Sequence, residues 1–331
     1  MSSLSAALAA ARDCKPGFSD KEEVWRCGKL RLYRYRSIAK PTNAVPLLIV
    51  YALVNRPYMM DLQEDRSLIR GLLSRGLDVY LIDWGYPDGA DRFMGLAEYL
   101  EEQLAGCVEQ ILAFHGIGAL NLLGVCQGGV FSLCFAALHP ERVRNLITMV
   151  TPVDFQTPAD LLSKWIRRID VDAWVGEGNV AGDALNQLFL ALMPFRLSHQ
   201  KYMDLLRGEA EPARIENFMR VEHWIFDSPD QAGAAFREFV VALYQENRLV
   251  RGGLEIAGRR IDLRSLELPI LNLIGSKDHL VPPASCAALR RLISSPDFTQ
   301  IELDLGHIGM YVSARAQREV PPAIADWLAT R

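Results

Sequence analysis

A cysteine within a glycine-rich hexapeptide is the residue of this sequence best suited to nucleophilic chemistry. The hexapeptide GVCQGG, residues 124–129, places Cys126 between the apolar run LNLL and the apolar segment VFSLCFAAL. A strand, a tight turn and a helix in this order form the nucleophile elbow G-x-S-x-G, here with cysteine in place of serine. The helix N-terminus directs free N–H groups and its positive end at the sulfur, which favours the thiolate. The alternative interpretation is a buried cysteine in an ordinary glycine-rich turn.

A nucleophilic thiolate needs a base, and the order of the chain favours His307. This histidine lies just after the last predicted strand, in IELDLGHIGMY, where Gly306 and Gly309 allow the loop to turn sharply. General base catalysis by a positioned histidine contributes roughly 10²–10⁴-fold. The remaining histidines are assigned to helix ends, to a helical region or to the vicinity of the acid: His115, His139, His199, His223 and His279.

The third group of such a triad is an acid that orients the imidazole. Asp278 is the first choice, because it follows a predicted strand in LPILNLIGSKDHLVPP and lies between the nucleophile and the histidine along the chain. Asp154 is the second choice and Asp83 the third, since each follows another predicted strand. Asp304 also follows a strand, but it lies on the same short segment as His307.

Two backbone N–H groups are expected to form an oxyanion hole beside the sulfur. The N–H of Gln127, the residue after the nucleophile, supplies one donor. The second donor is expected from Val54 or Asn55, in the loop VNRPY that follows the apolar run PLLIVYAL. Side chains do not decide between these two residues, because the donor belongs to the main chain.

Candidates for the wall of a substrate pocket come from three separate segments. They are His279 beside the predicted acid, Asp154 after a strand, and Trp224 in an aromatic-rich helical region.

The elements that position these residues alternate between strand and helix along most of the chain. Residues 1–20 predict weak structure or one amphipathic helix, and 24–38 alternates as an antiparallel hairpin with Gly28 at its turn. Continuous apolar runs indicate strands buried on both faces, and the segments between them have helical character. Strands are predicted at 46–53, 78–82, 120–125, 145–150, 269–274 and 299–303, and helices at 62–75, 93–114, 129–138, 283–293 and 322–329.

This alternation breaks between residues 155 and 254, which read as helical, without a clear strand. The predicted fold is therefore α/β: a mainly parallel, doubly wound sheet with a helical cap inserted between its sixth and seventh strands. The order nucleophile, acid, histidine along such a sheet is that of the α/β-hydrolase fold. The expected division is an N-terminal segment 1–45 with an edge hairpin, a core formed by 46–154 and 255–331, and a cap 155–254.

Composition excludes several classes of protein. The chain has 331 residues, with 36 basic and 40 acidic side chains and a net charge of −4, so no basic stripe suggests nucleic-acid binding. Its six cysteines form no C-x-x-C pair, which argues against a zinc site or a disulfide framework and suits a reducing cytosol. No signal peptide is expected, and the longest apolar run, 44–54, is too short for a membrane span. We expect a cytoplasmic protein that needs no metal.

Several separate blocks of the sequence resemble polyhydroxyalkanoate (PHA) synthases, most closely the class III catalytic subunit, a poly(3-hydroxybutyrate) polymerase. The resemblance extends from about residue 46 to 328, and the short length and the G-x-C-x-G box favour class III, with class IV as the alternative. The first 45 residues resemble the family poorly. The blocks are PLLIVYALVNRPYMMDLQ, VYLIDWGYPD, LNLLGVCQGGVFSL, ALHPERVRNLITMVTPVDF, WIFDSPDQAG, DHLVPP and GHIGMYVS.

The resemblance implies an acyltransferase and a role for each member of the triad. Cys126 would carry the growing chain, and His307 would activate that thiol or deprotonate the incoming hydroxyl. Asp278 would orient His307 or assist the deprotonation. The implied substrates are (R)-3-hydroxyacyl-CoA thioesters, with short side chains such as 3-hydroxybutyryl, and CoA is released without another cofactor. A non-catalytic accessory subunit, a homodimer or hetero-oligomer, and a location at the surface of a PHA granule are implied as well.

Two other functions fit the same residues. A cysteine hydrolase of esters or lactones would use the same triad on the same fold, although the matches at TPVDF and WIFDSPDQAG argue against it. An inactive, granule-associated scaffold would keep the fold without the chemistry, although the complete set of nucleophile, base and acid argues against that.

Overall fold

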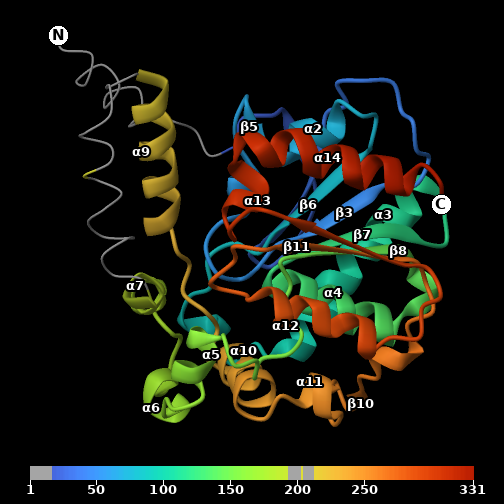
Figure 1. Ribbon diagram of the computed structural model, residues 1–331. Coiled ribbons are helices and arrows are strands. Elements are labelled where there is room, and N and C mark those ends of the chain that lie inside the picture. Colours follow the sequence, from blue (N-terminus) through green and yellow to red (C-terminus); the bar gives the residue numbers. More distant parts are fainter. Residues whose placement is uncertain (1–16, 193–202, 204–211) are drawn as a thin grey trace.

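The computed structural model describes residues 17–192, 203 and 212–331, so the helix considered within 1–20 lies almost entirely outside the described residues, as does His199. A single eight-stranded sheet forms the centre of the molecule, in the order β1-β2-β6-β3-β7-β8-β11-β12 (Figure 1). The strands from β6 to β12 pair in parallel, and β1 and β2 add an antiparallel edge. The bounds are β1 Lys21–Cys27, β2 Leu30–Tyr35, β3 Leu47–Val50, β6 Val79–Asp83, β7 Leu120–Val125, β8 Val143–Met149, β11 Ile270–Gly275 and β12 Phe298–Leu303.

Alternate side chains of the central strands enter two separate cores, as the pleat of a strand requires. Leu48 and Val50 of β3 pack into the core beneath α3 and α4, whereas Leu47 and Ile49 pack into the core beneath α2 and α14. This is why the central strands read as unbroken apolar runs. Figure 1 shows the resulting layers of helix, sheet and helix. The helices are α2 Leu68–Leu73, α3 Ala105–His115, α4 Gln127–Leu138, α12 Pro283–Ala287, α13 Gly309–Val312 and α14 Ala314–Leu328.

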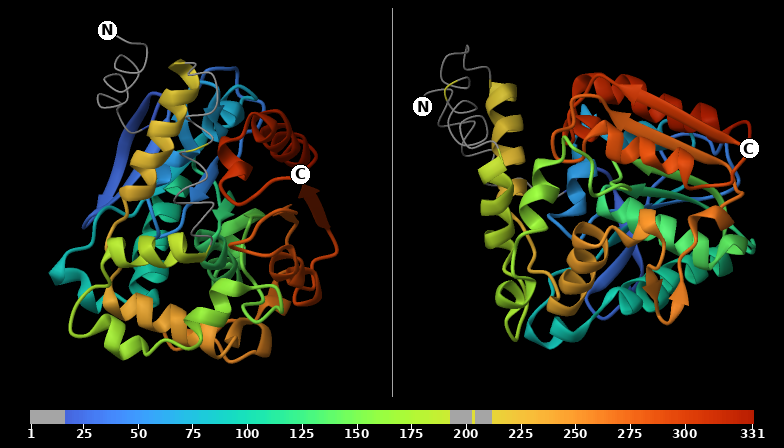
Figure 2. Two further views of the ribbon diagram at one scale, coloured as in Figure 1. Left: turned by 60° about the vertical axis from the view of Figure 1, so that its left-hand side comes forward. Right: turned by 60° about the horizontal axis from the view of Figure 1, so that its bottom comes forward.

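Helices also make up most of the described residues between 155 and 254, and Figure 2 shows α7 and α9 to one side of the layered core. An isolated bridge between Val180 and Gln231 is a strand pairing that the sequence did not predict here, and an equally unpredicted hairpin of β9 with β10 follows directly after residue 254. The division of the chain into core and cap units stays a prediction. The bounds are α5 Leu161–Ile166, α6 Val171–Val175, α7 Gly182–Leu192, α9 Pro212–Phe226, α10 Gly233–Phe239, α11 Arg248–Arg251, β9 Glu255–Ile256 and β10 Arg259–Arg260.

The helix predicted at 62–75 is wrong in its first half. A small hairpin of β4 (Asp61–Gln63) and β5 (Arg66–Ser67) precedes α2. The fully buried Asp61 carboxylate accepts hydrogen bonds from the hydroxyls of Ser67, at 2.6 Å, and Ser19, at 2.9 Å. A buried carboxylate requires such donors, and the segment is therefore extended here, with helix beginning only after the N-cap Ser67.

Two further helices begin at other residues than predicted. The segment predicted as a helix over 93–114 opens with the end of a 3-10 turn, Gly89–Phe93, and becomes a π-helical stretch, Glu98–Leu104, before α3. The final helix α14 starts at Ala314 rather than at Pro322, and it contains both prolines. Proline lacks an N–H donor and usually marks a helix start. Here the ring of Pro321 packs against Gly71 of α2, where an added Cβ would lie 2.5 Å from Pro321 Cγ.

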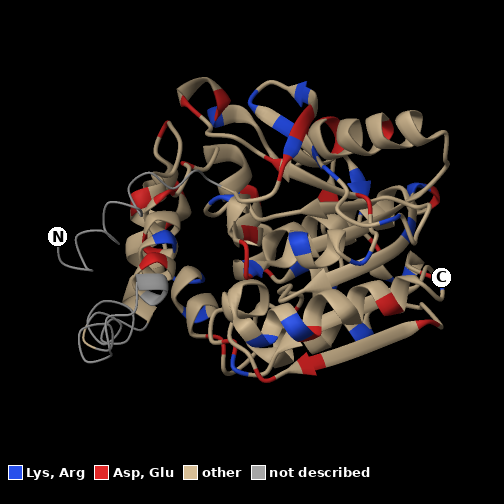
Figure 3. Cartoon of the chain, turned by 90° about the horizontal axis from the view of Figure 1, so that it is seen from above, with Lys and Arg blue, Asp and Glu red and all other residues tan. Residues whose placement is uncertain are grey.

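Charged side chains of both signs are interspersed over the described part of the chain seen in Figure 3. Within the described residues, no helix combines the length and the apolar composition that crossing a bilayer requires.

Candidate active site

The elbow predicted around Cys126 forms where β7 ends and α4 begins. Cys126 has φ 54° and ψ −122°, a left-handed conformation that a residue with a side chain adopts at a cost. Its N–H donates to the Met149 carbonyl at 2.9 Å, and its own carbonyl accepts from the N–H of Gly129 at 3.0 Å. These two bonds hold the strained turn. The sulfur stands ahead of the first turn of α4, whose free N–H groups favour negative charge.

Glycines surround Cys126 because the backbone approaches other atoms too closely for side chains. A Cβ on Gly128 would lie 2.1 Å from the Val50 carbonyl oxygen, and one on Gly129 would lie 1.8 Å from Thr151 Oγ1. A Cβ on Gly124 would lie 2.4 Å from the Gly129 Cα atom. The helix can start directly behind the sulfur only because these positions lack a side chain.

The structure brings His307 and Asp278 together below this sulfur. His307 Nδ1 lies 2.6 Å from Asp278 Oδ2, and both side chains are buried. The other carboxylate oxygen of Asp278 accepts the N–H groups of Leu280 and Val281, at 2.9 Å each. Asp278 is thus fixed on both oxygens, and it presents one of them to the imidazole. The ring of His307 also interacts with Cys126, and both residues line the same pocket.

The electrostatic environment of His307 favours the imidazolium. Burial lowers the pKa of His307, but the charges of Asp278 and of a Cys126 thiolate raise it further, and the net pKa lies well above the ordinary value. A positively charged imidazole beside a cysteine sulfur is one of the arrangements that activate a cysteine nucleophile.

Asp154, the second choice for the acid, serves another purpose. Its carboxylate binds the Asn247 side chain at 3.0 Å and the Arg291 guanidinium at 2.5 Å. Burial raises the pKa of Asp154, but the hydrogen bonds from Gln156, Asn247 and Arg291 outweigh it, and the net shift is downward. Asp154 does not line the pocket, which contradicts its assignment as a pocket residue. Its position after β8 directs the carboxylate toward the segment after α12 instead.

The remaining acid candidates are also occupied elsewhere. Asp83 binds Arg56 Nη2 at 2.7 Å. Asp304 binds Lys277 Nζ at 2.9 Å on the exposed side of the loop that carries His307, and the hydrogen bond from Lys277 lowers the pKa of Asp304.

The three residues predicted for the oxyanion hole lie around the sulfur. Gln127 is the first residue of α4, and Val54 and Asn55 lie in the loop after β3; all three line the same pocket as Cys126. The Gln127 side chain has a role that the sequence did not reveal. Its Oε1 accepts the N–H of Leu53 at 3.0 Å, so the residue predicted to offer one amide also holds the loop predicted to offer the other.

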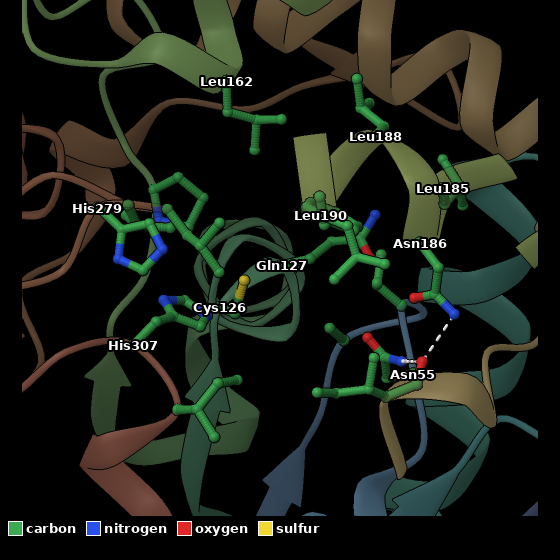
Figure 4. A pocket seen from close by; sticks show the side chains of 18 of the residues that line it. Asn55, Cys126, Gln127, Leu162, Leu185, Asn186, Leu188, Leu190, His279 and His307 are labelled. Carbon is green, nitrogen blue, oxygen red and sulfur yellow. Dashed lines mark hydrogen bonds between the residues drawn. The ribbon is translucent and has the colours of Figure 1, made fainter. Parts of the chain in front are cut away.

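The pocket above Cys126 has a volume of about 800 Å³ and is mainly apolar. Figure 4 shows Cys126 and His307 on one side of it and Leu162, Leu185 and Leu188 on the other. His279 and Trp224, both predicted for the wall, line it. Trp224 donates its indole N–H to the Arg56 carbonyl at 2.7 Å. Apolar walls above a reactive group exclude water from it.

Two tyrosines behind the triad were not predicted. The rings of His307 and Tyr311 lie 6.4 Å apart in an edge-on arrangement, and those of Tyr51 and Tyr311 lie 6.3 Å apart. Burial raises the pKa of both phenols, so both stay neutral beside the thiolate. The available signal was their position in the sequence. Tyr51 directly follows β3, and Tyr311 ends the segment GHIGMY that contains His307. Among the described residues, no group of three or more His, Cys, Asp or Glu is arranged to hold a metal ion.

Comparison with known proteins gives a family and a set of relatives. A family model described as alpha/beta hydrolase fold matches residues 45–314. The chain is 53% identical over 318 residues to a poly(3-hydroxyalkanoate) polymerase subunit PhaC of Allochromatium vinosum, covering 95% of this chain and 90% of the relative. Proteins of the same name from Thiocystis violacea and Synechocystis are 50% and 49% identical, with 95% and 96% of this chain and 89% and 86% of the relatives covered.

Solved structures similar to this chain share its fold. A hydrolase from Pseudomonas aeruginosa superposes with a TM-score of 0.55 at 16% identity, covering 93% of this chain and 98% of that one. An enol-lactonase from Burkholderia xenovorans gives a TM-score of 0.53 at 19% identity, covering 91% and 97%. The predicted fold class is thereby confirmed.

Proposed function

The chain belongs to the poly(3-hydroxyalkanoate) polymerase family of α/β-hydrolase-fold enzymes, and we propose that it polymerises (R)-3-hydroxyacyl-CoA through an acyl group carried on Cys126. The preferred substrate is 3-hydroxybutyryl-CoA, and the chain is the catalytic subunit of a class III synthase. The observation that carries this proposal is the contiguous array of Cys126, His307 and Asp278 at the base of an apolar pocket.

Acylation begins when the Cys126 thiolate attacks the thioester carbonyl. The oxyanion is stabilised by the N–H of Gln127 and by an N–H of Val54 or Asn55, and its collapse breaks the bond to the CoA sulfur. CoA leaves as a thiolate that takes a proton from the His307 imidazolium. One thioester replaces another, so this step is nearly balanced in energy and needs no other cofactor.

Chain growth is the second transfer. The now neutral His307 accepts the proton of a 3-hydroxyl group while that oxygen attacks an acyl carbonyl on sulfur. The new oxoester is more stable than the thioester that breaks, so polymerisation proceeds downhill. Asp278 stabilises the imidazolium that forms. Water must lose to the hydroxyl as the acceptor, and the apolar pocket supports that outcome.

The relatives are named as subunits of a polymerase, which indicates a multi-subunit synthase with a polymeric product. We propose a non-catalytic accessory subunit as partner, assembly as a homodimer or hetero-oligomer, and action in the cytoplasm at the surface of a PHA granule.

Incubation with (R)-3-hydroxybutyryl-CoA, alone and with a co-expressed accessory subunit, tests the proposal. Insoluble polymer together with free CoA is expected, and Cys126→Ala should release no CoA. Free 3-hydroxybutyrate without polymer would identify a cysteine hydrolase instead. No CoA release under either condition, from a protein whose Cys126 is not selectively alkylated by iodoacetamide, would indicate a scaffold.

A further inference from the structure

The loop after β3 is hydrogen-bonded to the C-terminal end of α9. Asn55 Nδ2 donates to the carbonyl oxygens of Trp224, at 3.3 Å, and Ile225, at 3.1 Å. Asn186 of α7 donates to the same Ile225 oxygen at 2.7 Å, and Figure 4 shows the Asn55 and Asn186 amides converging there. The last carbonyls of a helix lack partners within the helix. Asn55 therefore caps α9 from the loop that carries the candidate oxyanion donors.

A second set of contacts also ties the end of α9 to the core. Asp227, which follows α9 directly, accepts the hydroxyl of Tyr58 at 3.0 Å and the hydroxyl of Tyr86 at 2.6 Å. Burial raises the pKa of Tyr58, and burial with the Asp227 hydrogen bond raises that of Tyr86 to about 12. Both phenols are therefore donors at every pH at which the enzyme would be assayed. The end of α9 is thus held on the core by Asn55 on one hand and by the two tyrosine hydroxyls on the other.

The backbone of Asn55 is left-handed as well as anchored. Its φ is 58°, in a region that asparagine adopts more readily than most residues with a side chain. On the other side of Val54, the N–H of Leu53 is held by Gln127 Oε1. The amides of Val54 and Asn55 thus lie between one anchor on the nucleophile elbow and one on α9.

We propose that Asn55 is a positioning residue whose side chain, by capping α9, holds the oxyanion-hole loop in its reactive geometry. Acyl transfer at Cys126 then requires this end of the cap to be docked. A motion that lifted α9 from the loop would admit water but would also disable the oxyanion hole, so the acyl group would be protected from hydrolysis while it was exposed. The inference rests on the proposed function for the identity of the oxyanion donors.

Two reactions of the Cys126 sulfur distinguish a misplaced oxyanion-hole loop from general damage to the site. Acylation by 3-hydroxybutyryl-CoA, followed as the first burst of CoA release, develops an oxyanion. Alkylation by iodoacetamide forms the S–C bond as iodide leaves, and it develops none. In Asn55→Gly the left-handed backbone is still allowed but both hydrogen bonds to α9 are lost. We expect acylation to slow by about 10²-fold, the effect of a roughly 1 Å misplacement, and alkylation to stay within about twofold.

A matched control uses another asparagine that joins the cap to the core. Asn179 Nδ2 donates to the Asp88 carbonyl at 2.7 Å, and Asn179 does not line the pocket. Asn179→Ala should acylate and alkylate as the wild type does. Asp227→Ala, which removes the second contact, should slow acylation selectively, and it replaces Asn55→Gly in the comparison if that variant does not fold.

Acylation at the wild-type rate in both Asn55→Gly and Asp227→Ala would overturn the inference. An equal loss of acylation and alkylation in these variants would overturn it as well. If the wild type does not react with the CoA thioester, the proposed function fails. Acylation by p-nitrophenyl acetate then provides the same comparison with alkylation, because it also passes through an oxyanion.

Discussion

At the scale of single residues, the chemistry depends on how one imidazole is held. Asp278 is bonded to His307 on one oxygen and to two backbone N–H groups on the other, so the carboxylate has no freedom to turn away. A carboxylate held in this way fixes the tautomer and the orientation of the ring and stabilises its charged form. In the proposed mechanism the imidazole then serves the sulfur in the first transfer and the hydroxyl in the second.

Asp278→Asn should keep the fold but lose most of the activity. The amide cannot stabilise the imidazolium, and it favours the wrong tautomer, so kcat for polymer formation should fall by about 10²- to 10⁴-fold. Asp154→Asn is the matched control, because Asp154 binds Asn247 and Arg291 away from the sulfur. An inactive Asp154→Asn beside an active Asp278→Asn would show that the acid has been assigned wrongly.

The pH dependence of chain growth follows from the raised pKa of His307. Burial lowers this pKa, and the charges of Asp278 and of the thiolate raise it above the ordinary value. In the acyl-enzyme the thiolate charge is gone, and Asp278 is then the remaining charge that raises the pKa of His307. Because the neutral imidazole takes the proton of the hydroxyl, the elongation rate should rise with pH through the pKa of His307 and then reach a plateau. Asp278→Asn should move the midpoint to lower pH, and an unchanged midpoint would count against this role.

The sequence indicated the three residues of the proposed triad because each stands at a recognisable point of the chain order: after the fifth strand of the sheet, after the next-to-last strand and after the last. It did not predict what positions them. The Gln127 side chain reaches Leu53, and Asn55 reaches Trp224 and Ile225, between segments far apart in the chain. Such contacts leave no local pattern, because they depend on how the loop and α9 meet in space.

At the scale of elements, the elbow shows why β7 and α4 were predictable. An unbroken apolar strand, a glycine-rich turn and an apolar helix agree in every local preference. The predictions were wrong where a distant contact opposed local preference. Asp61 is buried among serine hydroxyls and keeps the start of the predicted helix 62–75 extended. Pro321 lies inside α14, where its ring packs on Gly71.

Gly129→Ala should push the nucleophile elbow away from Thr151, which lies just after β8. The new Cβ would lie 1.8 Å from Thr151 Oγ1, at a place where both backbones are fixed. Overpacking of this kind costs about 1–3 kcal/mol of unfolding free energy, and displacement of the elbow should also abolish most CoA release. Urea denaturation measures the first effect. Gly118→Ala, with open space around its Cβ, should stay within about 0.5 kcal/mol of the wild type; equal stability of the two variants would contradict the steric explanation.

At the scale of the whole molecule, the layered core supplies rigidity and the helices of 155–254 supply cover. The two main cores lie on opposite faces of the sheet, and a third, of residues from α5, α6, α7 and α10, lies beyond the strand ends. The pocket is lined by both parts: Cys126 and His307 come from the core, and Leu162 and Leu188 come from the cover. In the proposed reaction, the choice between hydroxyl and water as acceptor therefore depends on segments that carry none of the proposed triad.

Adjacent leucines of α5 allow a direct test of that cover. Leu162 is 4% exposed and lines the pocket, whereas Leu161 is 40% exposed and does not. Leu162→Asn places a polar group where it can retain water near the acyl group, so the ratio of free 3-hydroxybutyrate to polymer per CoA released should rise. A gain of about tenfold corresponds to roughly 1.4 kcal/mol of differential barrier. Leu161→Asn should leave the ratio unchanged, and Leu162→Met should restore it, because volume and polarity are then close to those of leucine. An unaltered product ratio in a folded Leu162→Asn enzyme would mean that water is excluded by something other than this wall.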